Sequence, residues 1–417
     1  MIARAPVGCA LAVFLSFPVA ATAQAGVDLA RLYGRVATED GRMYEGFLRW
    51  GTNEAGWYDI LHSNKRIPER NRRDAERLGW EPGERKNRIE IFGVGITLPG
   101  GRASISRSAQ SGIRFGHLSS LERLGSSRAR VVLRSGEELE LHGGGDLGSS
   151  LGRISVEDAR GGIVQLAWSD LRAVDFMPTP ARASAMGERL WGTLITRDGD
   201  RFTGYVAWDI DEALTTDVLD GEAEGRDRKI PFSDIRVIAR NSSRSARVLL
   251  ESGEDVVLSG TNDVNDSNRD ILVADPALGE VRVAWEELDR VEFSRPPGGA
   301  GLPAFDGGRR LRGTVETVRG ERHAGLIRWD NDEEYTWEIL DGELRRGIDL
   351  DIEFGAIASI ERQGFRTSVV TLRDGRRFEL GNSNDVDENN KGVYVERADS
   401  GLVLVPWDSF RRVSFDG

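Results

Sequence analysis

"RVVLRSGEELELHGGGDLG" (residues 130–148) occurs in two further versions, "RVLLESGEDVVLSGTNDVN" (residues 247–265) and "VVTLRDGRRFELGNSNDVD" (residues 369–387). The three stretches align without a gap, and the same spacing then leads in each case to a tryptophan and a phenylalanine. These aligned residues are Trp168, Trp285 and Trp407, followed by Phe176, Phe293 and Phe415. Self-similarity over so long a period predicts three copies of one structural unit.

Each copy also begins with a related first half. These halves read "LYGRVATEDGRMYEGFLRW" (32–50), "LWGTLITRDGDRFTGYVAW" (190–208) and "LRGTVETVRGERHAGLIRW" (311–329), and segments rich in proline and glycine separate the copies. We therefore expect three domains of two halves each. Their expected limits are 26–178 with an insertion at 64–111, 187–295 and 308–417.

All halves share an alternation of apolar residues, a turn that ends in glycine, and a second alternating strand. In "VRVAWEELDRVEF" (281–293) the alternation stops for one short helical turn and then resumes. This pattern resembles that of the SH3-like and Sm-like small β-barrels. The resemblance implies an all-β protein of three tandem domains, each a pair of five-stranded barrels. A β-propeller is the alternative.

Tryptophan recurs at matching places in the halves of the three copies. Small barrels bury little surface, so a large aromatic residue at one recurrent position is expected to fill each core. The residues concerned are Trp50, Trp168, Trp208, Trp285, Trp329 and Trp407.

The N-terminus predicts export. Arg4 precedes an apolar run and then "ATAQAG", which is typical of a signal peptide at residues 1–25. Cys9 is the only cysteine and lies in this segment, so the mature chain is expected to have no disulfide. The formal charge of −12 argues against a nucleic-acid partner. We expect a periplasmic or extracellular protein without a transmembrane segment.

An acidic stretch, "WDIDEALTTDVLDG" (208–221), returns as "WDNDEEYTWEILDG" (329–342) and in reduced form as "WGTNEAGWYDILHS" (50–63). Paired carboxylates can act as general acid and base when they converge on a cleft. It would be unusual for an active site to occur in two copies and to have lost most of its carboxylates in the third. The stretch is therefore predicted to be an architectural loop with solvated carboxylates.

The second halves contain a candidate cation loop. Oxygen-bearing side chains alternate in "NDVNDSNRD" (262–270) and "NDVDENNKG" (384–392), as at the start of a calcium loop, although the later glycine and glutamate of an EF-hand are missing. Turns in which Asp and Asn bond their own backbone are the alternative. Weak calcium binding, the only cofactor considered, is assigned to Asp263, Asn265, Ser267, Asp385, Asp387 and Asn389.

The insertion at 64–111 differs most from the repeated pattern. Residues 65–107 contain eleven Lys or Arg against six Asp or Glu, and "IPERNRRDAERLGW" (67–80) predicts a short helix. "IEIFGVGITL" (89–98) predicts one or two strands or a hairpin. The basic side chains are expected either to bind a partner or to pack on acidic loops of the same chain. The partner-binding candidates are Arg70, Arg72, Arg73 and Arg77.

The four histidines are scattered, and no nucleophile elbow or zinc motif occurs, so no catalytic residue is assigned. We expect a non-enzymatic scaffold or protein-binding repeat protein of the bacterial cell envelope, with an envelope protein or polymer as its unidentified partner. The alternative is a protein that binds a carbohydrate or an envelope polymer, either alone or with the assistance of calcium. Its binding aromatics would be Trp57, Tyr58, Trp80 and Trp337.

Overall fold

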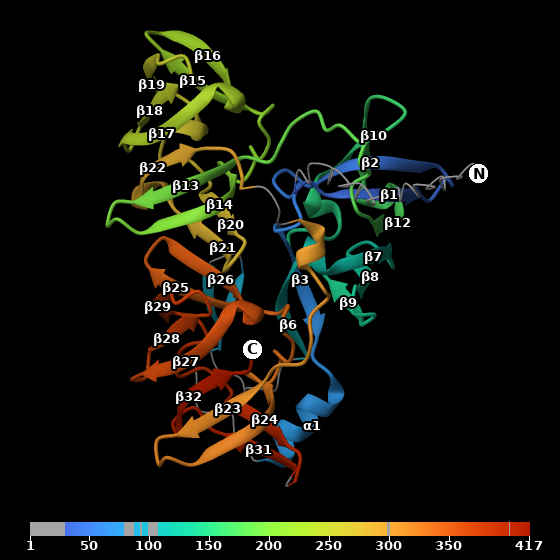
Figure 1. Cartoon of the computed structure of the whole chain (residues 1–417), viewed down its shortest axis with the longest axis vertical. Helices are drawn as coiled ribbons and strands as arrows, with labels where there is room; N and C mark the ends of the chain where they lie inside the picture. The colour runs from blue at the N-terminus through green and yellow to red at the C-terminus, as the bar shows by residue number, and fades with distance from the viewer. Residues whose placement is uncertain (1–29, 79–86, 92–93, 99–106, 298–300, 400) are drawn as a thin grey trace, which may run out of the picture.

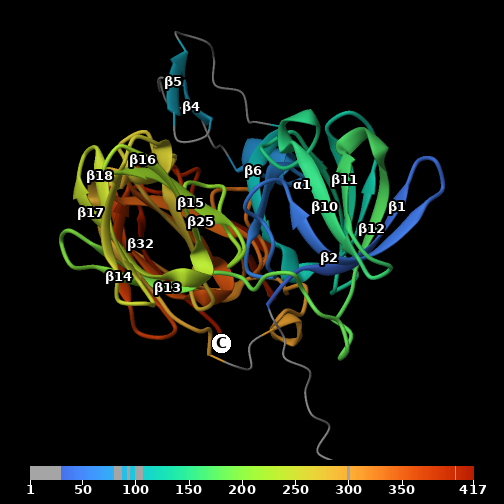
Figure 2. The same cartoon turned by 90° about the horizontal axis from the view of Figure 1, so that it is seen from above.

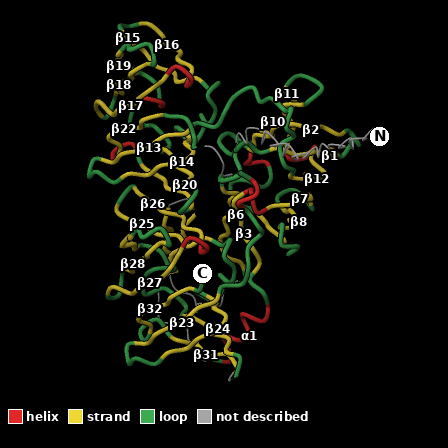
Figure 3. Tube along the Cα trace, viewed as in Figure 1, coloured by secondary structure: helices red, strands yellow, loops and turns green. Residues whose placement is uncertain are grey.

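The chain is built almost entirely of antiparallel β-strands. The computed structural model describes residues 30–78, 87–91, 94–98, 107–297, 301–399 and 401–417. Within these ranges lie 32 strands and a single α-helix, α1 (Glu69–Arg77), and Figure 3 shows the strands throughout the molecule. The expected all-β class is thus confirmed. The expected signal peptide at 1–25 lies outside the described residues.

Ten strands make up the first copy, which we call repeat 1 (residues 26–178). They are β1 (Tyr33–Thr38), β2 (Met43–Trp50), β3 (Ile60–Arg66), β6 (Ser108–Arg114), β7 (Leu118–Arg123), β8 (Arg128–Leu133), β9 (Glu138–His142), β10 (Arg153–Asp158), β11 (Ile163–Ala167) and β12 (Leu171–Phe176). They pair in the order β11-β10-β2-β1-β12-β7-β8-β9-β3-β6.

Repeat 2 (187–295) has the same ten strands in the same order. They are β13 (Trp191–Thr196), β14 (Arg201–Ala207), β15 (Val218–Ala223), β16 (Arg226–Pro231), β17 (Ile235–Ser242), β18 (Ser245–Leu250), β19 (Asp255–Ser259), β20 (Ile271–Asp275), β21 (Gly279–Val283) and β22 (Leu288–Phe293). The pairing runs β21-β20-β14-β13-β22-β17-β18-β19-β15-β16.

Repeat 3 (308–417) follows the same plan. Its strands are β23 (Arg312–Thr317), β24 (Arg322–Arg328), β25 (Ile339–Arg345), β26 (Ile348–Glu353), β27 (Ile357–Gln363), β28 (Thr367–Leu372), β29 (Arg377–Gly381), β30 (Val393–Arg397), β31 (Gly401–Val405) and β32 (Phe410–Phe415). The order is β31-β30-β24-β23-β32-β27-β28-β29-β25-β26.

The two halves of each repeat exchange hairpins. In repeat 3 the hairpin β25–β26 belongs to the first half by sequence but pairs with β29 of the second half, and β30–β31 pairs in return with β24. The five-stranded barrels expected from the sequence are therefore not closed. Backbone hydrogen bonds that would close each half join the two halves instead. The unbroken ten-strand order also contains no separate four-stranded blades of a propeller.

The short turn before the last strand of each half is present. Five of the six such turns are single 3₁₀ turns and the sixth is an ordinary turn at 407–409. The expected burial of the six recurrent tryptophans is confirmed, with at most 6 % exposed. In each repeat the indole of the first half meets that of the second edge to face, as in the pair Trp208–Trp285.

Repeats 2 and 3 form one column, and repeat 1 lies beside it (Figures 1 and 2). The column is continuous because the edge strands β21 and β26 pair from Gly279↔Ile352 to Val283↔Ile348. One hydrophobic core accordingly runs through repeats 2 and 3. The core of repeat 1 is separate and includes side chains from the linker and from the side of the column, such as Phe305 and Trp337.

The insertion extends the tip of the hairpin β3–β6. These strands pair from Ile60↔Arg114 to Arg66↔Ser108, whereas the corresponding hairpin β15–β16 closes with a turn at Glu224 and Gly225. The expected short helix is α1, which Figure 1 places beside β24 and β31 of repeat 3. The expected hairpin is β4 (Asn87–Ile91) with β5 (Val94–Leu98). In the described part of the chain, no helix is long and apolar enough to cross a membrane.

Candidate functional site

All three repeats meet where the hairpin β3–β6 lies against the seam between β21 and β26. Gly112 of β6 faces Ile339 of β25 so closely that a Cβ atom would lie 3.0 Å from the isoleucine side chain. Charged side chains cross this contact in several places. A groove of about 570 Å³ opens at one end of it, and residues of all three repeats and of the linker before repeat 3 line the groove. We call it the junction groove.

A buried ionic triad forms one wall of the junction groove. Glu353 at the end of β26 lies 3.3 Å from Nε of Arg114 and 3.3 Å from Nε2 of His117. The guanidinium of Arg114 also donates to the carbonyl oxygens of Asp275 and Pro276, so this one arginine joins repeat 1 to both other repeats. The charge of Arg114 and the hydrogen bond from His117 outweigh burial and lower the pKa of Glu353.

His117 is held from both ring nitrogens. Its Nδ1 accepts the backbone N–H of Gly307 at 3.2 Å. In the neutral ring the proton is therefore on Nε2, which donates to Glu353. The ring also packs edge to face on Phe305 of the linker. These contacts fix the linker against repeat 1.

Two arginines of the groove lining form no ion pair in the described residues. Arg309 and Arg373 line both the junction groove and an adjoining cavity of about 140 Å³, together with Thr336. Arg373 donates to the carbonyl oxygens of Gly355 and Asp416. Neither guanidinium lies within ion-pair distance of a carboxylate in the described ranges. Burial and the nearby charge of Arg309 lower the pKa of Arg373. Asp416 opposes these two effects, and Asp306 and Asp374 also line the junction groove. Arg309 and Arg373 are the cations of the lining that are free to pair with an anionic ligand.

The acidic stretch and the candidate calcium loop come together in one place in each repeat. In repeat 3, Asp385 accepts the indole N–H of Trp329 on its carbonyl oxygen and the backbone N–H of Asp341 on its carboxylate. Asp263 does the same in repeat 2, and Asp146 in repeat 1. We call each group an acidic cluster. The clusters comprise Glu54, Asp59 and Asp146; Asp209, Glu212, Asp217 and Asp263; and Asp330, Glu333, Glu338 and Asp385.

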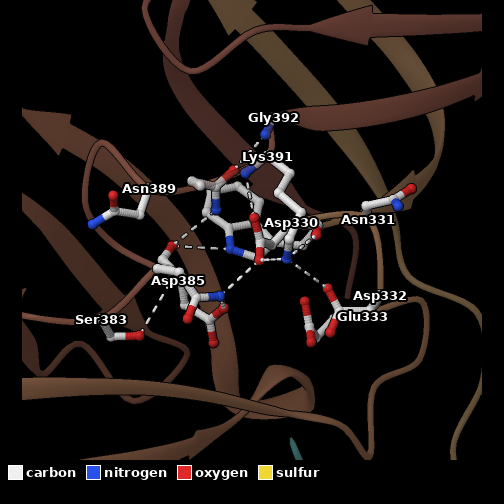
Figure 4. A network of polar contacts seen from close by, with 12 residues as sticks. Asp330, Asn331, Asp332, Glu333, Ser383, Asp385, Asn389, Lys391 and Gly392 are labelled. Atoms are coloured by element: carbon white, nitrogen blue, oxygen red, sulfur yellow. Dashed lines mark hydrogen bonds and ion pairs between the residues drawn. The ribbon is translucent and has the colours of Figure 1, made fainter. Parts of the chain in front are cut away.

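The aspartate behind the tryptophan is the centre of the acidic clusters of repeats 2 and 3. Asp330 has a φ of +43°, in the left-handed region, and its side chain is completely buried. It accepts hydrogen bonds from Asn384 and from Lys391. Figure 4 shows Asp330 between Asp385 on one side and Asp332 and Glu333 on the other. Repeat 1 has Gly51 at this place, which adopts the same left-handed conformation without a carboxylate.

The carboxylates of the clusters in repeats 1 and 3 are buried, which differs from the expectation of solvated carboxylates. In repeat 2, Glu212 and Asp217 are half-buried and the side chains of Asp211 and Asp220 are partly exposed, so the expectation holds there in part. In repeat 3 a cation that is distant in sequence compensates the buried charge. Lys65 of repeat 1 reaches Glu338 of repeat 3 and donates to the carbonyl of Asp332 at 2.6 Å. A second carboxylate in each cluster caps its own loop, as when Asp217 accepts the N–H groups of residues 213 and 214.

Burial is the largest cause of the pKa shifts of the glutamates in the clusters. It raises the pKa of Glu212 to about 9, with Asp263 and Asp211 as further causes. Burial also raises the pKa of Glu54 and of Glu333 well above the ordinary range. A carboxyl that keeps its proton near neutral pH resembles a general acid. Here, however, the clusters are packed under the loops that they cap, which is an architectural arrangement.

The six residues proposed for calcium do not converge as one alternating loop. Asn265 accepts the backbone N–H of Ser267, and Asp387 accepts that of Asn389. These are the Asx turns of the alternative interpretation. Asp263 and Asp385 instead belong to the acidic clusters. Asp263 lies with Asp209 and Glu212 in a group whose ligand atoms are within 4.8 Å of one another, which could hold a metal ion. Calcium binding by the loops stays a prediction.

The basic residues of the insertion make contacts within the chain. Arg70 pairs with Glu334 of repeat 3 at 2.7 Å, while Arg72 and Arg73 lie near Glu69 and Arg77 lies near Asp74. Asn71, which is completely buried, completes the docking of α1: it donates to Glu334 and accepts from Arg328. For α1, packing on acidic loops of the same chain is thus the arrangement that is observed.

The aromatics that were considered for carbohydrate binding are part of the core. Trp57, Tyr58 and Trp337 are at most 3 % exposed, so they offer no platform to a sugar ring. Trp80 lies outside the described residues. The three described side chains are buried because neighbouring repeats cover the loops that carry them.

Sequence reasoning missed the residues of the junction groove. The triad of Arg114, His117 and Glu353 joins positions in repeats 1 and 3, and no local pattern marks them. A signal did exist for Arg309, since "GGRRLRG" (307–313) is a basic run where the linker meets repeat 3. Comparison of the chain with protein-family models, with curated proteins and with solved structures finds no match.

Proposed function

We propose that the protein is a non-enzymatic binding scaffold of an extracytoplasmic compartment, which holds an acidic segment of a partner protein in the junction groove. The observation that carries the proposal is the pair Arg309 and Arg373. Neither guanidinium forms an ion pair in the described residues, and both line a groove of the size that ligand sites have. Carboxylates are the groups that such a pair binds with good geometry.

The connections between repeats support a scaffold that keeps its groove in a fixed shape. Arg189 of repeat 2 pairs with Asp59 of repeat 1 at 2.7 Å, and both side chains are at least nine-tenths buried. Arg49 pairs in the opposite direction with Asp217 of repeat 2. The groove is therefore formed before any ligand arrives, which lowers the entropy cost of binding.

A binding role fits the groove better than catalysis. Both ring nitrogens of His117, the histidine in its wall, have partners in Gly307 and Glu353. The side chain is therefore placed to support the structure, and neither nitrogen is free to act as a general base. The extracytoplasmic location rests on the N-terminal sequence, whose basic, apolar and small-residue order is that of an export signal.

The proposal can be tested with a defined anionic probe. We expect a fluorescent oligoglutamate peptide to bind, with an affinity that falls as salt is added. The double variant Arg309→Glu, Arg373→Glu should abolish the change in fluorescence anisotropy. Arg244→Glu, in an exposed turn of repeat 2, is the matched control and should bind as the unmodified protein does.

Equal binding by the double variant and the control would refute the groove as the site. Capture from an envelope extract follows as the second step. A partner retained by the unmodified protein and the control, but lost with the double variant, should carry an acidic segment that competes with oligoglutamate.

A further inference from the structure

A second group of polar side chains lies at the same junction but outside the lining of the groove. His62 of β3, Glu280 of β21 and Asp351 of β26 come from repeats 1, 2 and 3 respectively. One ligand atom from each lies within 4.8 Å of the other two. All three residues are on paired strands, so their backbone positions are fixed before any ligand binds.

The set of atoms suits a transition-metal ion. An imidazole nitrogen with two carboxylates is a ligand set that Zn²⁺ accepts, with open positions left for water. Nε2 of His62 lies 3.6 Å from Oε1 of Glu280. Two ligands on one tetrahedral zinc ion, each about 2.0–2.1 Å from it, are about 3.3 Å apart. The present separation therefore needs only a small side-chain adjustment.

In the absence of a metal, the positive charge beside the two carboxylates comes from His62. Glu280 is buried, and His62 is its one cationic partner within ion-pair distance in the described residues. No hydrogen bond or ion pair of the Asp351 side chain is found in the described part of the chain, although its backbone is paired with Glu280 and Asp341. Arg282, two residues along β21, is directed to Asp270 at 4.0 Å. A divalent ion would compensate both carboxylates at once.

We propose that His62, Glu280 and Asp351 form a binding site for a divalent transition-metal ion, of which Zn²⁺ is the representative, at the junction of the three repeats. The ion would fasten each repeat to the other two at one point. The backbone N–H of His62 is already held by Asp146, which keeps this part of β3 in place. The site is independent of the proposed peptide groove, because none of its residues lines that groove.

Calorimetry of the full chain with Zn²⁺, after treatment with a chelator, tests the proposal. We expect one equivalent to bind and the melting temperature to rise with zinc concentration. His62→Gln and Asp351→Asn should each lower the affinity at least about tenfold, because each removes a ligand. His323→Gln, on β24 of repeat 3, is the matched control and should bind zinc with unchanged affinity.

A second measurement guards against variants that fold poorly. Co²⁺ should give a visible absorption spectrum with the unmodified protein, and Asp351→Glu should shift this spectrum while circular dichroism shows an unchanged fold. Binding that is absent, or that survives both His62→Gln and Asp351→Asn, overturns the proposal. Loss of zinc binding in Glu212→Gln but not in His62→Gln would also overturn it, because the ion would then occupy the acidic cluster of repeat 2.

Discussion

The acidic clusters of repeats 2 and 3 have almost the same geometry but obtain their cations differently. In repeat 2 the central Asp209 is bound by Arg269, whose side chain is 51 % exposed. In repeat 3 the corresponding Asp330 is bound by Lys391, which is less exposed, and Lys65 adds a second charge from repeat 1. Glu333 therefore has a cation within 3.7 Å. The corresponding Glu212 has none in the described residues.

This difference indicates what the insertion contributes. Lys65 lies near the end of β3, which α1 follows in the chain. Helix α1 contacts the acidic loop of repeat 3 as well, because Asn71 donates to the carbonyl of Asn331. The acidic loop of repeat 2 meets repeat 1 through Arg49 and Thr52 instead, and Glu212 and Asp217 are only half-buried. The extra chain in repeat 1 thus allows a carboxylate cluster in repeat 3 to be buried more deeply, and it joins the two repeats in doing so.

The largest effect should come from a feature that the two clusters share. Trp208→Ala and Trp329→Ala should each lower the free energy of unfolding by about 3–5 kcal/mol, because each removes a completely buried indole and its hydrogen bond to the loop. Denaturant titration measures both losses. Phe365→Ala, at an exposed site, should have almost no effect. If the two losses of unfolding free energy differed markedly, the two cores would contribute differently to stability in spite of their similar geometry.

The next effect should separate the clusters. Lys65→Met should cost about 3–5 kcal/mol of unfolding free energy, because Glu338 and Glu333 would lose a buried cation. Arg269→Met should cost under about 1 kcal/mol, since its pair is exposed on the arginine side and Asp209 keeps other donors. A double-mutant cycle of Lys65→Met with Glu338→Gln measures the coupling. Similar costs for both cation variants would contradict the comparison.

Much of the fold could be predicted because the relevant signals are local. The alternation of apolar residues, the glycine turns and the recurrent tryptophans depend on neighbours in sequence, and they correctly indicated strands, turns and buried indoles. The exchange of hairpins could not be predicted. The pairing of β25 with β29 satisfies the same backbone groups as a closed barrel would, so the sequence pattern of each strand is equally compatible with either.

The candidate site was less accessible to sequence reasoning for the same reason. The stretch that begins at Trp329 looks solvated when only its charges are counted, because Lys65 is far away in the chain. In the loop that begins at Asn384, the sequence does not show that Asp385 binds the indole of Trp329 and the backbone of β25. Both features depend on long-range partners, which a single sequence does not identify.

The last effect depends on pH and should appear in repeat 2, where the glutamate has no cation in the described residues. Burial raises the folded-state pKa of Glu212 to about 9, above its ordinary value in the unfolded chain. The folded state therefore binds a proton more tightly than the unfolded state. The resulting contribution to stability is complete below the unfolded pKa and is lost as pH rises through about 9.

Glu212→Gln should remove this dependence, because the amide imitates the protonated carboxyl at every pH. We expect the variant to be close to the unmodified protein in unfolding free energy at acid pH and more stable than it in alkali. Denaturant titrations at several pH values measure the difference, and Glu251→Gln at an exposed position is the control. A stability difference that stays constant across the whole pH range would mean that Glu212 is ionised in the folded protein. That result would contradict the raised pKa of Glu212 and would separate this residue from Glu333, whose pKa is also raised by burial.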